Sequence, residues 1–128
     1  EIFGEKTYHG WCDPCRCVRT EEYKLIANFT TAPFFEDPCQ TYRAATTTVV
    51  PEDPAYAYHP YIELYDLRND PNEFENLADK PEYEKQQKIL TKKLFNWMTS
   101  TKDPLLTGIP MSPHHKRVLE ILDSRDNG

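Results

Sequence analysis

The strongest periodic pattern of the chain lies in residues 81–100, where apolar and charged positions recur at helical spacing. The positions that follow steps of three or four residues are Tyr83, Gln87, Leu90, Leu94, Trp97 and Met98. Ile89 and Phe95 are expected to broaden this apolar face. Asp79 precedes the pattern and can cap the helix, and Pro81 suits its first turn. The pattern predicts a long amphipathic helix that packs on one face of a sheet.

Short runs rich in β-branched and aromatic residues predict the strands of that sheet. Residues 15–20 and 23–29 are separated by two glutamates, which favours a hairpin. Residues 61–67 alternate and predict a further strand, and the segment TTTVV at 46–50 suits a short edge strand. A second short helix is expected at 113–123. The predicted fold class is α+β: a small antiparallel sheet of three to four strands packed against one long C-terminal amphipathic helix.

Residues 30–60 are rich in Pro, Thr and aromatic side chains and show no sustained period. We interpret them as a long irregular excursion, and loops of this length inside a domain are often functional or docked on a neighbour. Their aromatic side chains suit either stacking on sugar rings or packing within the loop, and packing is the more common use.

Composition and charge argue against some classes of partner. The 128 residues suit one domain, and the formal net charge is −6. Such a charge argues against nucleic acid or an anionic membrane as a partner, because no broad basic field is present to hold phosphate. No apolar run approaches the roughly 20 residues needed to cross a bilayer, and no signal peptide is visible.

The second half of the chain carries an ordered series of short motifs. They are ELYDL at 63–67, DPNE at 70–73, NLA at 76–78, Trp97 and the pair DP at 103–104. This series resembles the C-terminal subdomain of the sulfatases, in the alkaline-phosphatase-like superfamily. The stretch EKTYHGWCDPCRCVRTEEYKLI is similar to a family stretch E-x-T-x-H … D-P-M-R-x-x-R-T-x-x-Y-K-L-I. The resemblance covers most of residues 5–117 and is closest to heparan N-sulfatase-like and arylsulfatase enzymes.

The same motifs also make sense as elements of folding alone. Asp70 and Pro71 set a turn, the Asn76 side chain can close it, and Leu77 can fill the gap before the helix. The series therefore identifies a scaffold rather than a reaction.

The resemblance implies that the parent protein is a sulfatase that hydrolyses sulfate esters or N-sulfate of a sugar, plausibly a glycosaminoglycan. Residues 1–128 would be its C-terminal subdomain, with 1–14 an edge segment from a missing N-terminal catalytic domain. Calcium and a formylglycine nucleophile are expected in that domain, and the 128-residue chain alone is predicted to be inactive. Family membership also implies an extracytoplasmic location: periplasmic, secreted or lysosomal. Because the fragment's domain contacts would be exposed, self-association is expected.

Three residues are candidates for substrate binding. By resemblance the E-x-T-x-H segment passes near the sulfated sugar substrate, so His9 would donate a hydrogen bond to a sugar hydroxyl or sulfate oxygen and Glu5 would bind an amine or hydroxyl. Arg16 offers a planar fork for sulfate, although strand arginines more often pair with acids on a neighbouring subdomain. The alternative for Glu5 and His9 is that both are ordinary surface side chains without a role in binding.

The stretch CDPCR at 12–16 also fits C-x-P-x-R, the pattern from which the family makes formylglycine. The family signature continues with a Leu-Thr-Gly-type tail that opens a helix, whereas CVRTEEYKLI follows here and predicts a strand. The stretch also falls inside the C-terminal resemblance, where Asp13, Pro14 and Arg16 match the strand pattern D-P-M-R. We therefore predict no catalytic residue in this chain.

The four cysteines are Cys12, Cys15, Cys17 and Cys39. A zinc site is one interpretation, but alternation would send only two of them to one strand face, and the first would precede the strand. We favour small buried hydrophobic cysteines, with a disulfide or redox role as a lesser alternative. No metal site is predicted. Asn28-Phe-Thr30 fits a glycosylation acceptor, and its position at a predicted strand end favours a chance match.

A second function from another class stays open. The chain could be a free-standing, non-catalytic module whose aromatic excursion binds a glycan or a protein, and a small zinc-binding domain is a third alternative. The pair His114-His115 does not suggest a metal site, because adjacent helical residues point apart.

Overall fold

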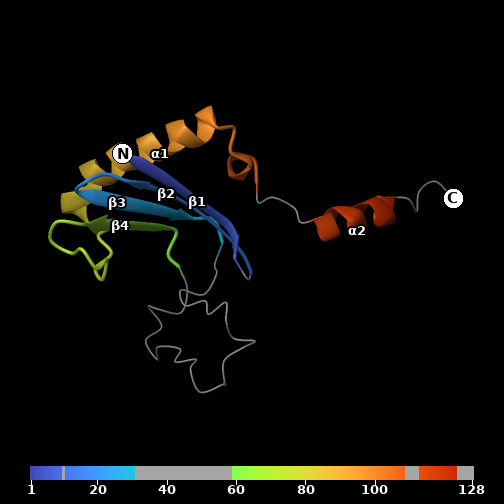
Figure 1. Ribbon diagram of the computed structural model, residues 1–128, viewed down its shortest axis with the longest axis horizontal. Helices are drawn as coiled ribbons and strands as arrows, with labels where there is room; N and C mark the ends of the chain where they lie inside the picture. The colour runs from blue at the N-terminus through green and yellow to red at the C-terminus, as the bar shows by residue number, and fades with distance from the viewer. Residues whose placement is uncertain (10, 31–58, 109–112, 124–128) are drawn as a thin grey trace, which may run out of the picture.

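The computed structural model describes residues 1–9, 11–30, 59–108 and 113–123 (Figure 1). Its elements in chain order are β1 (Ile2–His9), β2 (Trp11–Arg19), β3 (Tyr23–Asn28), β4 (Ile62–Asp66), η3 (Pro81–Tyr83), α1 (Glu84–Ser100), η4 (Pro104–Leu106) and α2 (Pro113–Asp123). The strands form one antiparallel sheet in the order β1-β2-β3-β4, and α1 lies across one face of it. The predicted α+β class is confirmed, and the excursion at 30–60 falls almost entirely outside the described residues, as does the strand expected at 46–50.

The sheet has one more strand at its beginning than the residue pattern predicted. Residues 2–9 pair with β2 as an edge strand, and β2 itself starts at Trp11 rather than at residue 15. Polar residues and Gly4 interrupt the apolar pattern of β1, which hides it in the sequence. A Cβ atom at Gly4 would lie 2.9 Å from the Cys17 sulfur, so any larger residue there would require the Cys17 side chain to shift. Whether residues 1–14 also contact another domain stays a prediction.

The predicted hairpin between β2 and β3 is confirmed, and Thr20 closes its turn. The Thr20 Oγ1 atom accepts hydrogen bonds from the backbone N–H groups of Glu22 and Tyr23, at 3.3 and 3.0 Å. Its backbone N–H donates to the Tyr23 carbonyl at 2.8 Å. A hydroxyl side chain thus supplies the turn that an Asn-Gly pair makes in other hairpins.

The core lies between the sheet and α1. Val18, Leu25 and Leu64 are in register across β2, β3 and β4, so their side chains fall on one face of the sheet. The other buried hydrophobic residues of the cluster are Leu77, Leu90, Leu94, Met98 and Leu105. Phe3 of β1 extends the cluster by stacking on Trp97, with ring centroids 5.1 Å apart.

The predicted helix is present, but two details of its prediction are wrong. Ile89 and Phe95 are 41% and 57% exposed, because at 3.6 residues per turn both lie more than a quarter turn from the centre of the buried stripe. Asp79 does not cap the helix. It adopts a left-handed backbone with φ of 62° and exchanges hydrogen bonds with Gln87, while Lys80 takes the N-cap position of η3.

The turn before the helix behaves as predicted. The Asn76 Oδ1 atom accepts hydrogen bonds from the N–H groups of Leu64 and Ala78, both at 2.9 Å, and its Nδ2 donates to the Ile62 carbonyl. The Leu77 N–H donates to the Leu64 carbonyl at 2.8 Å, and its side chain is buried. This segment thereby covers the outer edge of β4. No helix within the described ranges is long and apolar enough to cross a membrane.

Two adjacent residues of α1 test the placement of its buried stripe. Leu94→Ala should lower the free energy of unfolding by about 2–5 kcal/mol, because a buried leucine leaves a cavity. Phe95→Ala should change it by about 0.5 kcal/mol or less, since the ring is largely exposed. Urea unfolding of both variants measures the difference, and equal losses would contradict this orientation of the helix.

Candidate functional site

The stretch CDPCR lies within strand β2. Cys12 is part of the strand and is the register partner of Tyr8, so the expectation that it precedes the strand is wrong. The strand continues without interruption to Arg19. The stretch therefore lies on extended backbone, as the tail CVRT predicted. Cys15 and Arg16 pair with Lys6 and Glu5, and the register of the β1–β2 pair shifts between Lys6 and Tyr8.

The cysteines are less buried than expected. Cys12 is exposed, and Cys15 and Cys17 are half-buried, so the prediction of buried cysteines is wrong for the first and only partly met for the other two. The reason is that alternation turns Arg16 and Val18 to the buried side of the sheet, whereas Cys15 and Cys17 lie on the opposite sheet face. Cys12 lies beyond the register shift of the β1–β2 pair, where this alternation no longer holds. Burial raises the pKa of the Cys15 thiol. Cys39 lies outside the described residues.

No group of three or more His, Cys, Asp or Glu suited to hold a metal ion occurs within residues 1–9, 11–30, 59–108 and 113–123. Cys12, Cys15 and Cys17 are described as free thiols. The side chain of His115 is exposed, while that of His114 lies outside the description.

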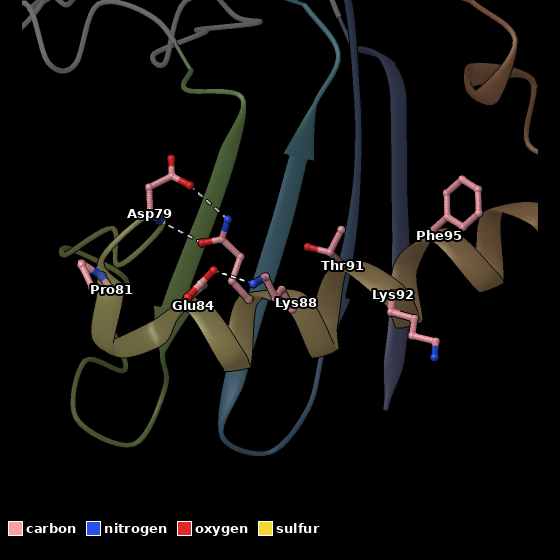
Figure 2. A pocket seen from close by; sticks show the side chains of 8 residues that line it. Asp79, Pro81, Glu84, Lys88, Thr91, Lys92 and Phe95 are labelled. Carbon is pink, nitrogen blue, oxygen red and sulfur yellow. Dashed lines mark hydrogen bonds and ion pairs between the residues drawn. The ribbon is translucent and has the colours of Figure 1, made fainter.

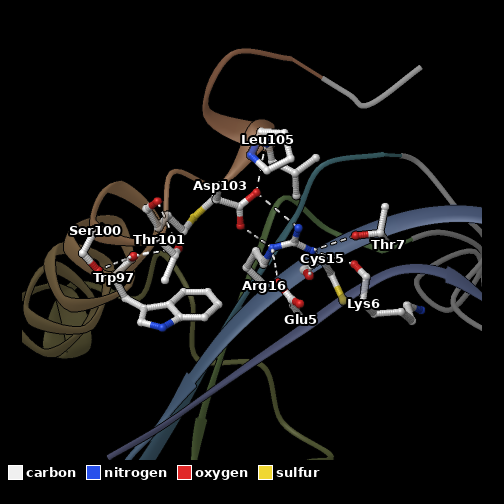
Figure 3. Close-up of polar contacts among 12 residues, drawn as sticks. Glu5, Lys6, Thr7, Cys15, Arg16, Trp97, Ser100, Thr101, Asp103 and Leu105 are labelled. Carbon is white, nitrogen blue, oxygen red and sulfur yellow. Dashed lines mark hydrogen bonds and ion pairs between the residues drawn. The ribbon is translucent and has the colours of Figure 1, made fainter. Parts of the chain in front are cut away.

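Arg16 is the centre of a buried group of polar contacts that joins β1, β2 and the turn after α1 (Figure 3). Its Nε donates to Asp103 Oδ2 at 2.5 Å, and its Nη2 donates to Asp103 Oδ1 at 3.2 Å. Its Nη1 donates to the backbone oxygens of Lys6 and Cys15, both at 2.9 Å. Both side chains of the ion pair are 3% exposed. The partner acid is therefore in this chain, in the turn after α1, rather than on a neighbouring subdomain.

Arg16 stabilises the charged form of the Asp103 carboxyl, and this carboxylate fixes the turn after α1. Hydrogen bonding from Arg16, with smaller help from the Leu105 N–H, holds the pKa of the Asp103 carboxyl below its usual range against the opposing effect of burial. The same carboxylate accepts from the Leu105 N–H at 3.0 Å and caps η4. The ion pair thus joins β2 to the segment that buries Leu105 in the core.

The three predicted substrate-binding residues are only partly brought together. Glu5 and Arg16 are register partners, and the Glu5 carboxylate lies 3.8 Å from the Arg16 Nε. Glu5 is 66% exposed, whereas Arg16 is buried. His9 ends the same strand about 13 Å further along, at 3.3 Å per residue, and its side chain lies outside the description. Their roles in substrate binding stay predictions.

Sequence reasoning missed a second buried polar group, centred on Glu63. The Glu63 carboxylate accepts hydrogen bonds from Asn28 Nδ2 at 2.7 Å and Tyr65 Oη at 2.5 Å, and His59 Nδ1 lies 3.2 Å away. Burial and the bond to Glu63 raise the pKa of Tyr65. The alternation E-L-Y could have placed Glu63 and Tyr65 on one face, but nothing local shows that this face is buried.

The same cluster accounts for the potential glycosylation site. Asn28 is buried, and its Nδ2 donates both to Glu63 and to the Pro60 carbonyl at 2.8 Å. The amide nitrogen that would carry a glycan is therefore fully engaged in the folded chain. This geometry supports the interpretation of the pattern as a chance match.

A groove runs along the outer side of α1 (Figure 2). Its lining residues are Asp79, Pro81, Glu84, Gln87, Lys88, Thr91, Lys92 and Phe95. The charges of the two acids and two lysines cancel, and Glu84 already binds Lys88 at 2.5 Å. None of the predicted substrate-binding residues lines this groove, which has the character of a solvated helix face.

Comparison with known proteins places the chain among the sulfatases. No family model matches it. The chain is 35% identical over 101 residues to an ulvan-active sulfatase of Formosa agariphila, covering 77% of this chain and 20% of that protein. It is 29% identical over 118 residues to the human N-sulphoglucosamine sulphohydrolase, covering 80% of this chain and 24% of that protein. The chain therefore spans about a fifth of the length of these relatives.

Solved structures agree in fold. A Bacteroides thetaiotaomicron protein described as a sulfatase and a 2-O glycosaminoglycan sulfatase each match with a TM-score of 0.55 and 22% identity. Each match covers 88% of this chain and 19% of the solved chain. The fold defines a small sheet-and-helix subdomain of the kind that sulfatases contain. The chain is a sulfatase-related segment, in agreement with its resemblance to the family's C-terminal subdomain.

Substitution of Asp103 tests the buried ion pair. Asp103→Asn should lower the free energy of unfolding at pH 7 by about 3–5 kcal/mol, because it leaves the Arg16 charge buried without its partner. Since the folded pKa of Asp103 is lowered, its contribution is complete above the ordinary carboxyl range and is lost as pH falls through the folded value.

Urea unfolding between pH 7 and pH 2 measures both effects. The wild-type chain should lose stability toward acid more steeply than Asp103→Asn. Asp79→Asn, at an exposed acid, should keep the wild-type pH dependence, and Arg16→Lys should keep part of the stability while losing the two-pronged contact. Identical acid profiles for the wild type and Asp103→Asn would contradict this role.

The cysteines of β2 should differ in reactivity. Cys12 is exposed, whereas burial raises the pKa of Cys15 and so reduces its reactive thiolate. Iodoacetamide at pH 8 should therefore alkylate Cys12 roughly ten times faster than Cys15. Timed mass spectrometry with fragment-ion localisation can resolve them, because both lie on one tryptic peptide. Comparable rates in the folded chain would exclude this placement, and denaturant should equalise them.

Proposed function

We propose that this chain is the C-terminal subdomain of a sulfatase and that its parent hydrolyses sulfate esters or N-sulfate groups of a sugar, plausibly within a glycosaminoglycan. The observation that carries the proposal is the joint match in sequence and fold to sulfatases. In each of them the matching segment makes up about a fifth of the length. The relatives and solved structures include an N-sulphoglucosamine sulphohydrolase and a 2-O glycosaminoglycan sulfatase. Sulfated saccharides are therefore the proposed substrate class.

In this proposal the chain completes the fold of the parent and does not supply its nucleophile. Cys12 lies on an extended strand inside a four-stranded sheet, where it pairs with Tyr8. The reacting group, a formylglycine beside a bound calcium ion, is expected in the catalytic domain of the parent. An extracytoplasmic location of the parent belongs to the same proposal.

The proposed substrate contacts come from β1. Glu5 is well exposed on this strand and His9 ends it, so a saccharide bound beside the strand would meet a carboxylate and then an imidazole. Arg16 has a different role, because its guanidinium binds both oxygens of Asp103 and two backbone carbonyls. We assign it to positioning β1 and β2 rather than to sulfate.

Aryl sulfate hydrolysis tests the proposal. The purified 128-residue chain should show no turnover with calcium present, whereas the parent protein should hydrolyse the ester. In the parent, Cys12→Ala should keep activity within about twofold, because a thiol on a sheet surface takes no part in the reaction. Alanine is the required substitution, since serine in this pattern can also be converted to formylglycine.

Two outcomes would overturn this assignment. Turnover by the isolated chain would show that it contains its own reaction centre. Loss of all activity in Cys12→Ala, with unchanged stability of the parent, would identify CDPCR as the modified signature.

A further inference from the structure

Helix α2 has one apolar and one charged face. Val118, Leu119, Ile121 and Leu122 span less than half of the helix circumference, and their side chains are 38–53% exposed. Arg117 and Glu120 lie on the other side and form an ion pair at 3.1 Å. Every α2 side chain that the structure describes is exposed, and Figure 1 shows the helix apart from the sheet. The apolar face is thus exposed to solvent in the described part of the chain.

A helix of this kind needs a surface to pack on. With 11 residues it is shorter than the roughly 12–15 residues at which isolated helices become marginally stable in water. Most helical stability in proteins comes from packing of the apolar face. The described body of this chain does not provide that surface, because every α2 side chain that the structure describes is exposed.

A second copy of the chain is a poor partner for this face. An 11-residue helix is about 16 Å long, and its face is far smaller than the roughly 800 Å² per partner that a stable complex buries. A small face is sufficient when both surfaces belong to one polypeptide, since a tether supplies an effective concentration in the millimolar range. The relatives that the chain matches are about five times longer than the matched part, so such a polypeptide has ample further surface.

We infer that the apolar face of α2 docks onto an apolar groove of the catalytic domain in the same parent sulfatase. This inference rests on the proposed function and adds the surface through which the two parts are held together. The four aliphatic side chains fill the groove, and the charged face with Arg117 and Glu120 stays in water. The contact would hold the subdomain, and with it β1, in a fixed position relative to the substrate.

Hydrogen–deuterium exchange of the peptide containing residues 113–123 tests the inference. In the isolated chain, α2 amides should exchange nearly as fast as unstructured peptide, at both low and high protein concentration. In the parent they should exchange at least about tenfold more slowly, because docking restricts opening of the helix. The double variant Val118→Asp with Leu122→Asp should abolish this protection, whereas Arg117→Asp, which places the same charge on the opposite face, should keep it.

Each other outcome identifies a different occupant and overturns the inference. Protection in the dilute isolated chain would mean that α2 packs on its own subdomain. Protection that grows with concentration would mean that a second copy covers it. Absence of added protection in the parent would exclude docking altogether. Sulfatase activity of the parent is measured separately, so an inactive parent with a protected α2 would remove the proposed function while leaving the docking intact.

Discussion

The structure depends on one buried ion pair that joins residues 87 positions apart in sequence. Arg16 and Asp103 are removed from water, which is costly unless every donor and acceptor finds a partner. Here the guanidinium fork fits the carboxylate, and its remaining nitrogen binds two backbone carbonyls. Because the same carboxylate caps η4, the pair fixes the exit of α1 and places Leu105 over the core.

The stretch CDPCR illustrates how backbone context decides chemistry. The spacing of a cysteine, a proline and an arginine fits a modification signature, yet here the arginine anchors a strand and the cysteine faces solvent. The proline lies buried within the same strand. Identical residue types at identical spacing thus serve packing and ion pairing when the chain is extended. A short pattern therefore acquires functional meaning only through the element that carries it.

Strand β1 and helix α2 differ in how they contact the rest of the described chain. Strand β1 pairs with β2 from Ile2 to His9, with one register shift between Lys6 and Tyr8, and carries the exposed Glu5. Helix α2 follows a segment outside the described residues and keeps its aliphatic side chains in solvent. One is a paired edge strand with an exposed carboxylate, and the other is a short helix with a solvent-exposed apolar face. Both properties are consistent with the proposed role of the chain as a subdomain of a larger sulfatase.

The sequence by itself determined the features that local spacing controls. These were the helix over 81–100, the β2–β3 hairpin, the Asn76 turn and the sulfatase relationship, since each depends on residues close together in the chain. Tertiary structure alone decided that residues 2–9 form an edge strand, that Arg16 pairs with Asp103, and that Glu63 is buried. Periodicity reports which positions share a face, but the layer that covers a face, and the partner that meets a charge, come from distant segments. For that reason the scaffold was predictable, whereas its buried polar contacts were not.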